Sequence, residues 1–426
     1  AIPEALPAVV TVSLAFGARK LSRRNSLVRN LPAVETLGSV TYICTDKTGT
    51  LTQNSMTAEQ FFFTSERHES LPSPEANAPW TELGQAMALN NDIVEKDGRP
   101  AGEPTELALF EAAHKAGFEK TALLETKPQL ASIPFDSKRK LMTTLHQSSE
   151  GVVAYIKGAP ESILALCRNA YEHGKAVAFV SHAVLAEASR MANEGYRVLA
   201  FARRDFISLP EQLDTETIEQ DLSFLGLVAL IDPPRAEVPQ AVEDCRTAGI
   251  TPVMITGDHP GTAMAIARRL GITQDEEAML SGEELAKLSD EKFARIVESI
   301  RVYARVTPQQ KLRIVKALQV NGEFVAMTGD GVNDAPALKR AGIGVAMGQK
   351  GTDVAREASD MILLDDDFAT IVRAVRAGRS IFDNIRKFIK DTMSSNSGEI
   401  WTLFLAPFLG LPIPLLPIHI LWINLV

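Results

Sequence analysis

The chain has 426 residues, which is enough for two or three domains that each bury a core of their own. Its 44 Lys and Arg residues are outnumbered by 53 Asp and Glu residues, and the net charge of -9 argues against a nucleic-acid-binding protein. The three cysteines, Cys44, Cys167 and Cys245, show no Cys-x-x-Cys or Cys/His spacing. We therefore expect buried, reduced thiols rather than disulfides or a zinc site.

The first residues of the chain are mostly apolar. Residues 1–17 are followed by the basic segment Arg19-Lys-Leu-Ser-Arg-Arg24. This order predicts the last part of a transmembrane helix with a positive cytoplasmic flank. A helix buried in a soluble protein is the alternative, and this end alone does not decide between the two.

Strands and helices alternate in the central part of the chain. Apolar, β-branched runs predict strands at residues 40–44, 251–255, 324–327, 342–346 and 361–364. Helical spacing is found at residues 261–270 and 309–318. This alternation predicts a doubly wound parallel sheet, an α/β fold. The first and second strands are much further apart than a crossover helix requires, so we expect a separate domain between them, near residues 58–221.

The last residues are again apolar. Residues 400–426 contain no Asp, Glu, Lys or Arg, and a Pro/Gly-rich cluster occupies residues 410–417. Because a spanning helix needs about 20 apolar residues, this end predicts one membrane helix, a turn and the start of another helix. The two ends together favour membrane segments over buried soluble helices.

The segment Asp46-Lys-Thr-Gly-Thr-Leu-Thr52 directly follows the first predicted strand, at the sheet edge where α/β proteins bind ligands. A carboxylate held there can attack phosphorus, and Gly49 lets backbone N–H groups close around phosphoryl oxygens. A lone Asp-x-x-Gly would also suit a structural turn. The complete heptapeptide, however, is the signature of P-type ATPases, and the chain resembles that family.

Three further segments carry the resemblance: Thr256-Gly-Asp258 after the second strand, Lys311 in the following helix, and residues 327–338 after the third strand. The resemblance covers residues 1–426. It implies a Rossmann-like phosphorylation domain of the haloacid-dehalogenase type at residues 18–57 and 222–375, with an inserted α+β nucleotide-binding domain at residues 58–221. It also implies the end of a transmembrane helix at residues 1–17 and a helix entering the membrane, a turn and a further helix start at residues 376–426.

The resemblance implies roles for the residues of these motifs. Asp46 is the nucleophile, Lys311 offsets phosphate charge, and Thr256 and Gly257 hydrogen-bond the phosphoryl oxygens. Asp258, the next residue of the same motif, is also expected to be catalytic. Mg²⁺ is held by the Asp46 carboxylate, the Thr48 main-chain carbonyl and Asp330, and Asn333 and Asp334 complete its surroundings. These groups suit phosphoryl transfer, which is catalysed mainly by positioning and electrostatics.

No Walker A motif occurs, so ATP must be held by other means. The resemblance implies that Phe135 stacks on the base, Glu106 contacts the adenine edge, Lys157 and Gly158 line the pocket, and Arg197 reaches the phosphates. Taken singly, Phe135 could instead be a core residue. Well-known calcium pumps have arginine where this chain has Ser137, a departure for which Lys138, Arg139 or Lys140 could compensate.

Four polar residues lie in the apolar end segments, where such groups are costly and mark functional sites: Glu4, Asn396, Glu399 and Asn424. Asn396 and Glu399 share one helical face. The resemblance to calcium pumps implies that these residues bind the transported cation. Carboxylate and amide oxygens suit Ca²⁺, although pumps for Na⁺, Mn²⁺ or H⁺ use similar residues.

The resemblance therefore implies ATP-driven cation transport through an aspartyl phosphate. The chain would be a fragment from the fourth to the sixth transmembrane helix of a multi-pass membrane protein whose central domains are cytoplasmic. Its partners would be ATP, the cation, the lipid bilayer, and the actuator domain and other helices of the pump. A soluble aspartyl-phosphate phosphatase and a non-catalytic nucleotide-binding module are the alternatives. Those phosphatases carry Asp-x-Asp, whose second carboxylate is the general acid and base, and here that position is Thr48.

Overall fold

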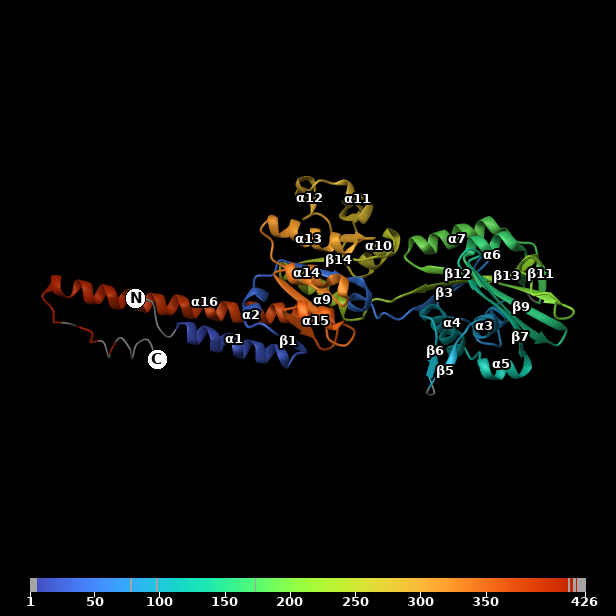
Figure 1. Ribbon diagram of the computed structural model, residues 1–426, viewed down its shortest axis with the longest axis horizontal. Helices are drawn as coiled ribbons and strands as arrows, with labels where there is room; N and C mark the ends of the chain where they lie inside the picture. Colours follow the sequence, from blue (N-terminus) through green and yellow to red (C-terminus); the bar gives the residue numbers. More distant parts are fainter. Residues whose placement is uncertain are drawn as a thin grey trace. The chain divides into compact units, whose positions relative to one another are not determined.

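The computed structural model describes residues 6–76, 79–96, 99–172, 174–412, 414–416 and 419. The chain divides into two compact units. The first unit comprises Ala1–Leu51, Arg235–Pro260 and Ala267–Val426, and the second comprises Thr52–Pro234 and Gly261–Ile266. Each unit has its own sheet, so each is described separately (Figure 1).

The first unit is built on an eight-stranded sheet with the order β1-β19-β18-β17-β2-β14-β16-β15. Its strands are β1 (Ser26–Val28), β2 (Tyr42–Asp46), β14 (Thr251–Ile255), β15 (Met279–Ser281), β16 (Val302–Ala304), β17 (Val325–Gly329), β18 (Ile343–Met347) and β19 (Met361–Leu363). All neighbouring pairs are parallel except β1 with β19. The predicted parallel α/β sheet is therefore confirmed, and β2 extends to Asp46.

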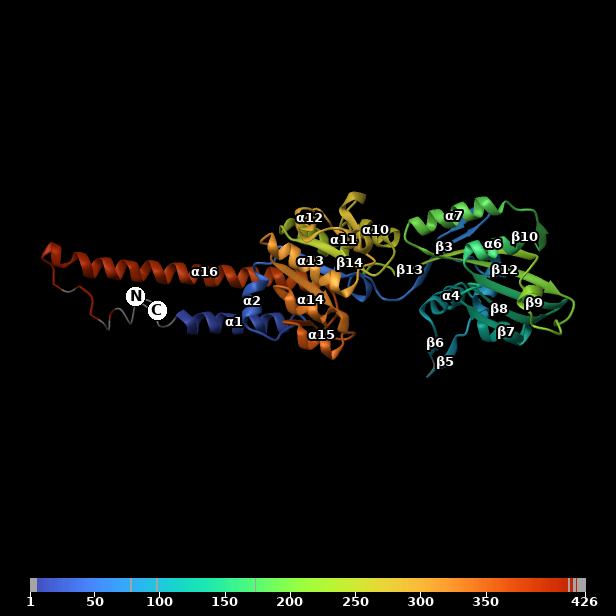
Figure 2. The same cartoon turned by 45° about the horizontal axis from the view of Figure 1, so that its top comes forward.

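Helices flank this sheet (Figures 1 and 2). They are α9 (Val238–Thr247), α11 (Gly282–Lys287), α12 (Asp290–Ile296), α13 (Pro308–Val320), α14 (Ala335–Arg340) and α15 (Asp353–Ala358). The helix α10 (Pro260–Arg269) is divided between the units, because its residues Gly261–Ile266 belong to the second. The central strands are buried on both faces, as parallel strands covered by helices must be. Apolar side chains of β2, β14 and β17 form the core together with Ile314, Val315 and Leu318 of α13.

Three helices of the first unit pack against one another: α1 (Leu6–Ser22), α2 (Pro32–Leu37) and the 38-residue α16 (Phe368–Leu405). Glycines permit this close approach, because a Cβ on Gly378 would lie 2.6 Å from Leu37 Cβ. Arg379 of α16 donates hydrogen bonds to the carbonyl oxygens of Ala248 and Val40. These carbonyls lie shortly before β14 and β2, so α16 is fastened to the start of both strands.

The described residues include no helix that combines the length and the apolar character needed to cross a membrane. The membrane segments expected at residues 1–17 and 376–426 stay predictions.

The second unit contains a nine-stranded, mostly antiparallel sheet with the main path β11-β10-β13-β12-β9-β8-β7, with β3 attached to β13 and β4 attached to β3. Its strands are β3 (Thr57–Phe63), β4 (Glu66–His68), β7 (Gln129–Asp136), β8 (Leu141–Ser148), β9 (Gly151–Gly158), β10 (Cys167–Glu172), β11 (Lys175–Val177), β12 (Arg197–Phe206) and β13 (Leu222–Ile231). The two short strands β5 (Val94–Lys96) and β6 (Arg99–Ala101) form a separate hairpin. All of β13 belongs to this unit, whereas the expected domain limits at residues 58 and 221 stay a prediction.

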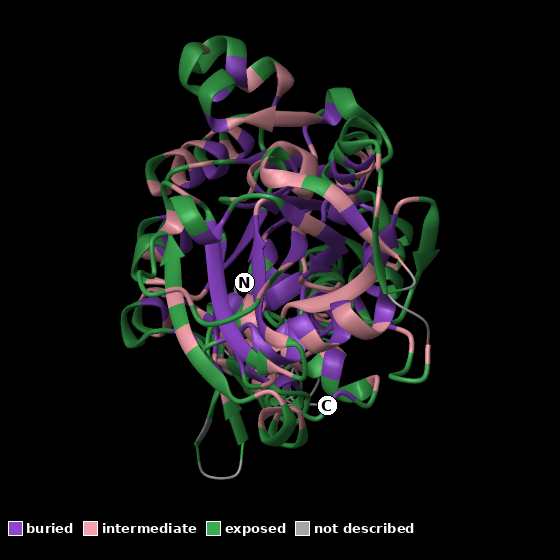
Figure 3. Cartoon of the chain, turned by 90° about the vertical axis from the view of Figure 1, so that its right-hand side faces the viewer, coloured by how far each residue is buried: buried purple, intermediate pink, exposed green. Residues whose placement is uncertain are grey.

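Helices complete the second unit: α3 (Trp80–Leu89), α4 (Pro104–Lys115), α5 (Lys120–Thr126), α6 (Pro160–Leu166), α7 (Ser181–Asn193) and the short α8 (Thr215–Ile218). Figure 3 shows the buried residues concentrated on the strands, with exposed residues on the outer helix faces. The mixed α/β character expected for this part of the chain is confirmed.

All three cysteines are free. Cys44 and Cys245 are buried as expected, but Cys167 is only half-buried, since it lies where α6 gives way to β10. Burial raises the pKa of each thiol to about 12. The cysteine thiols are therefore protonated at neutral pH, which lowers their reactivity.

Candidate functional site

Asp46 is the last residue of β2 and lies at the carboxyl edge of the sheet between β14 and β17. Its backbone N–H donates to Thr328 Oγ1 at 3.2 Å, and Thr328 Oγ1 donates to Thr45 Oγ1 at 3.1 Å. Both threonines are fully buried. This pair of hydroxyls fixes the backbone that carries the Asp46 carboxylate, a role for Thr328 that the sequence analysis did not assign.

The turn after Asp46 is held from two sides. It spans Lys47–Leu51 and is kinked at Thr48 and Gly49, where Gly49 adopts φ 76°, a conformation that favours glycine. The Arg235 guanidinium donates to Gly49 O at 2.9 Å, and Lys47 Nζ forms an ion pair with Asp258 Oδ2 at 2.7 Å. Contacts with Arg235 and Asp258 thus hold the turn in place. Thr48 is exposed on this turn.

Lys311 lies in the first turn of α13. Pro308 and a capping box between Thr307 and Gln310 begin that helix. Lys311 Nζ lies 2.6 Å from Asp46 Oδ2 and 2.8 Å from Asp334 Oδ1. Burial lowers the pKa of Lys311, but the two carboxylates more than offset this, so its pKa lies above the usual value. A buried ammonium group therefore stays positively charged beside Asp46.

Asp330 and Asp334 occupy the turn after β17. Asp334 Oδ2 accepts hydrogen bonds from the N–H groups of Asp330 and Gly331 at 3.3 and 3.1 Å, so both of its carboxylate oxygens have partners within the chain. Burial raises the pKa of Asp330 above its usual range, and the negative charges of Asp46 and Asp334 raise it further. Three carboxylates therefore share this edge of the sheet with the Lys311 ammonium group.

A bound Mg²⁺ would fit this arrangement. Over the described ranges, no three His, Cys, Asp or Glu side chains are close enough to form a metal site by themselves. Mg²⁺ is commonly bound through one or two carboxylates, with phosphate oxygens and water completing the octahedron. Asp46, Asp330 and the Thr48 carbonyl supply such a set, and a divalent cation would relieve the repulsion between the carboxylates. Asn333 is exposed in the same turn.

Thr256, Gly257 and Asp258 follow β14, which runs parallel to β2 with Ile255 opposite Asp46. Thr256 is buried, and its Oγ1 accepts a hydrogen bond from the Asp258 N–H at 3.1 Å. Gly257 is exposed, and a Cβ placed on it would meet no other atom within 4 Å. The three residues lie at the same sheet edge as Asp46. The contacts of Thr256 and Gly257 with phosphoryl oxygens and the catalytic role of Asp258 stay predictions.

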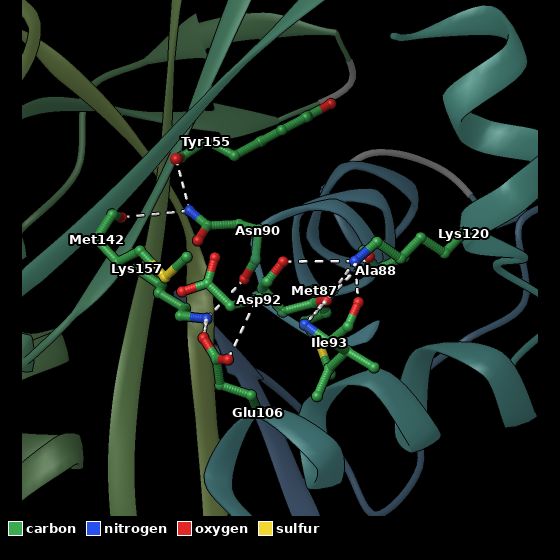
Figure 4. Close-up of polar contacts among 11 residues, drawn as sticks. Met87, Ala88, Asn90, Asp92, Ile93, Glu106, Lys120, Met142, Tyr155 and Lys157 are labelled. Atoms are coloured by element: carbon green, nitrogen blue, oxygen red, sulfur yellow. Dashed lines mark hydrogen bonds and ion pairs between the residues drawn. The ribbon is translucent and has the colours of Figure 1, made fainter. Parts of the chain in front are cut away.

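In the second unit, Glu106 of α4 and Lys157 of β9 form an ion pair (Figure 4). Lys157 Nζ lies 2.5 Å from Glu106 Oε1 and donates to Asn90 O at 2.6 Å. The side chains are 8% and 14% exposed for Lys157 and Glu106. Burial lowers the pKa of Lys157, and the Glu106 carboxylate opposes that shift. Two residues far apart in the sequence are thus brought together at a partly enclosed position.

Phe135 and Gly158 lie at the same end of the sheet. Strand register places Asp136 opposite Leu141 and Leu141 opposite Gly158. The Phe135 ring is 62% exposed, so it is not a core residue, which was the alternative open from the sequence. Glycine is required at position 158, because a Cβ there would lie 2.2 Å from Lys140 O.

The basic residues considered for phosphate contacts differ in their surroundings. Arg197 is exposed and donates to Thr105 Oγ1 at 2.8 Å, which places it next to Glu106 on α4. Arg139 pairs with Glu219, and Lys140 pairs with Glu161. Lys138 is exposed beside Ser137, and whether it compensates for the departure there stays a prediction.

Asn396 and Glu399 lie on one face of α16, and each is only 8% exposed. Asn396 Oδ1 and Glu399 Oε1 receive no hydrogen bond from the residues that the structure describes. Buried oxygen atoms in this state are costly unless a cation or another donor satisfies them. The other two expected ligands, Glu4 and Asn424, lie outside the described residues.

Comparisons with known proteins agree with this geometry. The family model of the P-type ATPase cytoplasmic domain N matches residues 79–237, and that of haloacid dehalogenase-like hydrolases matches residues 309–375. The chain is 45% identical over 430 residues to calcium-transporting ATPase 1 of Bacillus cereus, covering 100% of the chain and 48% of that protein. It is 45% identical over 451 residues to the calcium-transporting ATPase of Bacillus subtilis, with coverage of 100% and 50%.

The name of a further relative refers to cations in general and not to calcium. The chain is 44% identical over 455 residues to the cation-transporting ATPase pma1 of Synechocystis, again with all of the chain and 50% of the relative covered. The chain spans about half the length of the curated relatives it matches.

Proposed function

This chain carries the domains of the P-type ATPase family, and we propose that it is the catalytic part of an ATP-driven cation pump. The proposal rests on one arrangement above all. Asp46 ends the central strand of a parallel sheet, and the charged Lys311 lies between its carboxylate and that of Asp334. This geometry is suited to a carboxylate that attacks a phosphoryl group.

In the proposed reaction, an Asp46 carboxylate oxygen attacks the γ-phosphorus of ATP. The new bond joins that oxygen to phosphorus, the bond between the γ-phosphorus and the bridging oxygen breaks, and ADP leaves with that oxygen. The chain's part is to hold the acceptor carboxylate in line and to offset the phosphate charge through Lys311. Mg²⁺ bound by Asp46, Asp330 and the Thr48 carbonyl would supply further charge neutralisation.

The absence of a carboxylate at position 48 favours a pump over a phosphatase. In an Asp-x-Asp phosphatase the second carboxylate activates a water molecule, which quickly hydrolyses the aspartyl phosphate. Here the exposed Thr48 cannot do so, and the nearby Asp258 carboxylate is paired with Lys47. The acyl phosphate would therefore persist long enough to drive a conformational change.

A labelling experiment tests the proposed function. Protein incubated with Mg²⁺ and γ-labelled ATP should retain an acid-stable label that hydroxylamine removes, as expected of an acyl phosphate. A label that hydroxylamine does not remove would show that the phosphoryl group is not bound to the Asp46 carboxylate. A protein that binds ATP but takes up no label would instead favour the non-catalytic nucleotide-binding module.

For the second unit, the proposal is an ATP site bounded by Phe135, Glu106, Lys157 and Gly158, with Arg197 directed to the phosphates. The support is the exposure of the Phe135 ring, the partly enclosed Glu106–Lys157 pair and the position of Arg197 beside Thr105. An exposed aromatic face can stack on adenine, and a carboxylate can accept a hydrogen bond from its amino group.

Phe135→Ala is expected to weaken ATP binding by roughly 1–3 kcal/mol, because it removes the stacking surface for the base. Isothermal titration calorimetry on the intact protein measures this change. Phe324→Ala, which truncates an exposed phenylalanine of the first unit, is the control and should bind ATP like the wild type. Equal affinity in the Phe135 variant would place the adenine pocket elsewhere.

For the transported ion we propose Ca²⁺, held by Asn396 and Glu399 together with Glu4 and Asn424. The buried oxygens of Asn396 and Glu399, which lack partners in the described part of the chain, support a cation site on α16. Ca²⁺ accepts such a set of carboxylate and amide oxygens, and relatives named calcium-transporting ATPases point the same way. Na⁺, Mn²⁺ and H⁺ are the alternatives. A screen of cations for stimulation of phosphoenzyme formation distinguishes them.

The remaining parts of the proposal concern the whole pump. Residues 1–17 and 376–426 would belong to its transmembrane helices, and the two units would lie in the cytoplasm. Its partners would be ATP, the cation, the lipid bilayer, and an actuator domain with further transmembrane helices. Without the actuator domain and the further transmembrane helices, the chain should bind nucleotide but transport nothing.

A further inference from the structure

A group of buried amides and ammonium groups surrounds the turn that follows α3 (Figure 4). Asn91 is 4% exposed, and its Nδ2 donates to the carbonyl oxygens of Met87 and Ala88 at 3.0 and 2.8 Å. Its Oδ1 accepts from the Ile93 N–H at 3.2 Å. Asn91 therefore satisfies carbonyl groups at the end of α3 and closes the turn at residues 90–93.

Lys120, the first residue of α5, is bound to the same turn. Its ammonium group donates to Asn91 Oδ1 at 2.7 Å, to Ile93 O at 3.1 Å and to Asn91 O at 3.4 Å. An ammonium group has three N–H bonds, so this turn accounts for all of them. Burial lowers the pKa of Lys120, and the nearby Glu106 and Asp92 carboxylates oppose that shift.

The turn that Lys120 holds contacts both members of the Glu106–Lys157 pair. The Asp92 N–H donates to Glu106 Oε2 at 3.1 Å, while Asn90 O accepts from Lys157 Nζ at 2.6 Å. Lys157 also donates to Glu106 Oε1 at 2.5 Å. Each oxygen of the Glu106 carboxylate is thus fixed by a different donor, and one of these donors belongs to the turn that Lys120 clamps.

We propose that Lys120 is a positioning residue for the nucleotide base. By clamping the turn at residues 90–93, it fixes the orientation of the Glu106 carboxylate and so sets a preference for adenine over guanine. The inference rests on the proposed ATP site. A carboxylate can only accept hydrogen bonds, and adenine presents an amino group where guanine presents an oxygen. A fixed carboxylate therefore binds the adenine amino group and repels the guanine oxygen. A mobile carboxylate can turn away from either group.

Lys120→Met in the intact protein tests this role by keeping the length of the side chain and removing its donors. Loss of one orienting contact is expected to weaken ATP binding roughly tenfold, and GTP binding should change little or improve. The ratio of ATP to GTP affinity, measured by calorimetry, should therefore fall. Lys115→Met, which removes an exposed ammonium group from α4, is the matched control and should keep the wild-type ratio.

A chemical rescue separates positioning from folding. Lys120→Cys treated with 2-bromoethylamine regains an ammonium group at nearly the original length, and its ratio of affinities should return toward that of wild-type protein treated in the same way. The treated wild type controls for modification of the half-buried Cys167. Lys120→Gln retains donors and serves as the milder variant if Lys120→Met fails to fold.

The outcomes distinguish the inference from the function on which it rests. A wild-type protein that does not bind ATP would overturn the proposed function and the inference with it. Wild-type binding without a preference for ATP over GTP would overturn the inference alone. A folded Lys120 variant that melts at a lower temperature but keeps the wild-type ratio of ATP to GTP affinity would also overturn the inference. Lys120 would then have only a structural role.

Discussion

Asp46→Asn is expected to abolish the acid-stable label that we propose the wild-type protein takes from γ-labelled ATP. The amide oxygen of asparagine is a poor nucleophile, so labelling should fall by roughly a thousandfold or more. The variant should still fold, because Lys311 loses its ion pair with Asp46 but keeps the one with Asp334, and Asp330 loses a repelling negative charge. Labelling is measured after acid quench, and circular dichroism confirms that the variant is folded.

Asp290→Asn provides the matched control. Asp290 lies in the same unit at the start of α12, its carboxyl group is 90% exposed, and it pairs with Arg313. Removing that exposed charge should leave labelling at the wild-type level, since an exposed ion pair contributes little to stability. Label that persists in folded Asp46→Asn protein would show that another residue accepts the phosphoryl group.

Glu399→Gln is expected to raise the Ca²⁺ concentration needed for phosphoenzyme formation by roughly tenfold or more, because a hard cation loses one of its charged ligands. ATP affinity should not change, since the proposed nucleotide site is built from residues of the second unit. Glu4→Gln should act in the same way. The measurement is the Ca²⁺ dependence of labelling in the complete pump that we propose, with ATP binding measured in parallel.

Asp391→Asn is the control on the same helix, because Asp391 is an exposed acidic residue of α16. Its Ca²⁺ dependence should match that of the wild type. If Glu4→Gln and Glu399→Gln also match the wild type, these residues are not ligands. If Na⁺ or Mn²⁺ stimulates labelling and Ca²⁺ does not, the proposal of a cation pump is retained and the proposal of Ca²⁺ as the transported ion is wrong.

The sheet of the first unit could be predicted because its long strands are buried on both faces. Such strands appear in the sequence as continuous apolar runs, as in β2 and β18. The three-residue strands β1, β15 and β16 were not predicted, whereas β19, of the same length, was predicted because it lies in the apolar run 361–364. Their pairing is decided by tertiary contacts.

The candidate functional site could be predicted from the sequence less fully than the sheet. Lys311 could be assigned only through the family motif, since a single lysine in a helix is ordinarily a solvated residue. Its position beside Asp46 depends on the order of strands in the sheet, which joins residues far apart in the chain. The exposure of Phe135 was also open, because an aromatic residue in a strand can face either side.

The cluster around Lys120 could not be predicted from sequence. Asparagines after a helix are typical of solvated turns, and nothing in the pattern indicates that Asn91 is buried. The hydrogen bonds of Lys120 join α5 to the end of α3, and Thr328 similarly joins β17 to β2. Such contacts arise from packing between elements, on which local spacing carries no information.

The attachment of α16 to the sheet has a mechanical consequence. Arg379 ties one part of this 38-residue helix to the carbonyls that precede β2 and β14, while Asn396 and Glu399 lie further along the same helix. A helix rises 1.5 Å per residue, so Asn396 and Glu399 lie about 25 Å and about 30 Å from Arg379 along the helix axis. A tilt or axial shift of α16 would therefore act on the backbone that precedes the strand ending in Asp46.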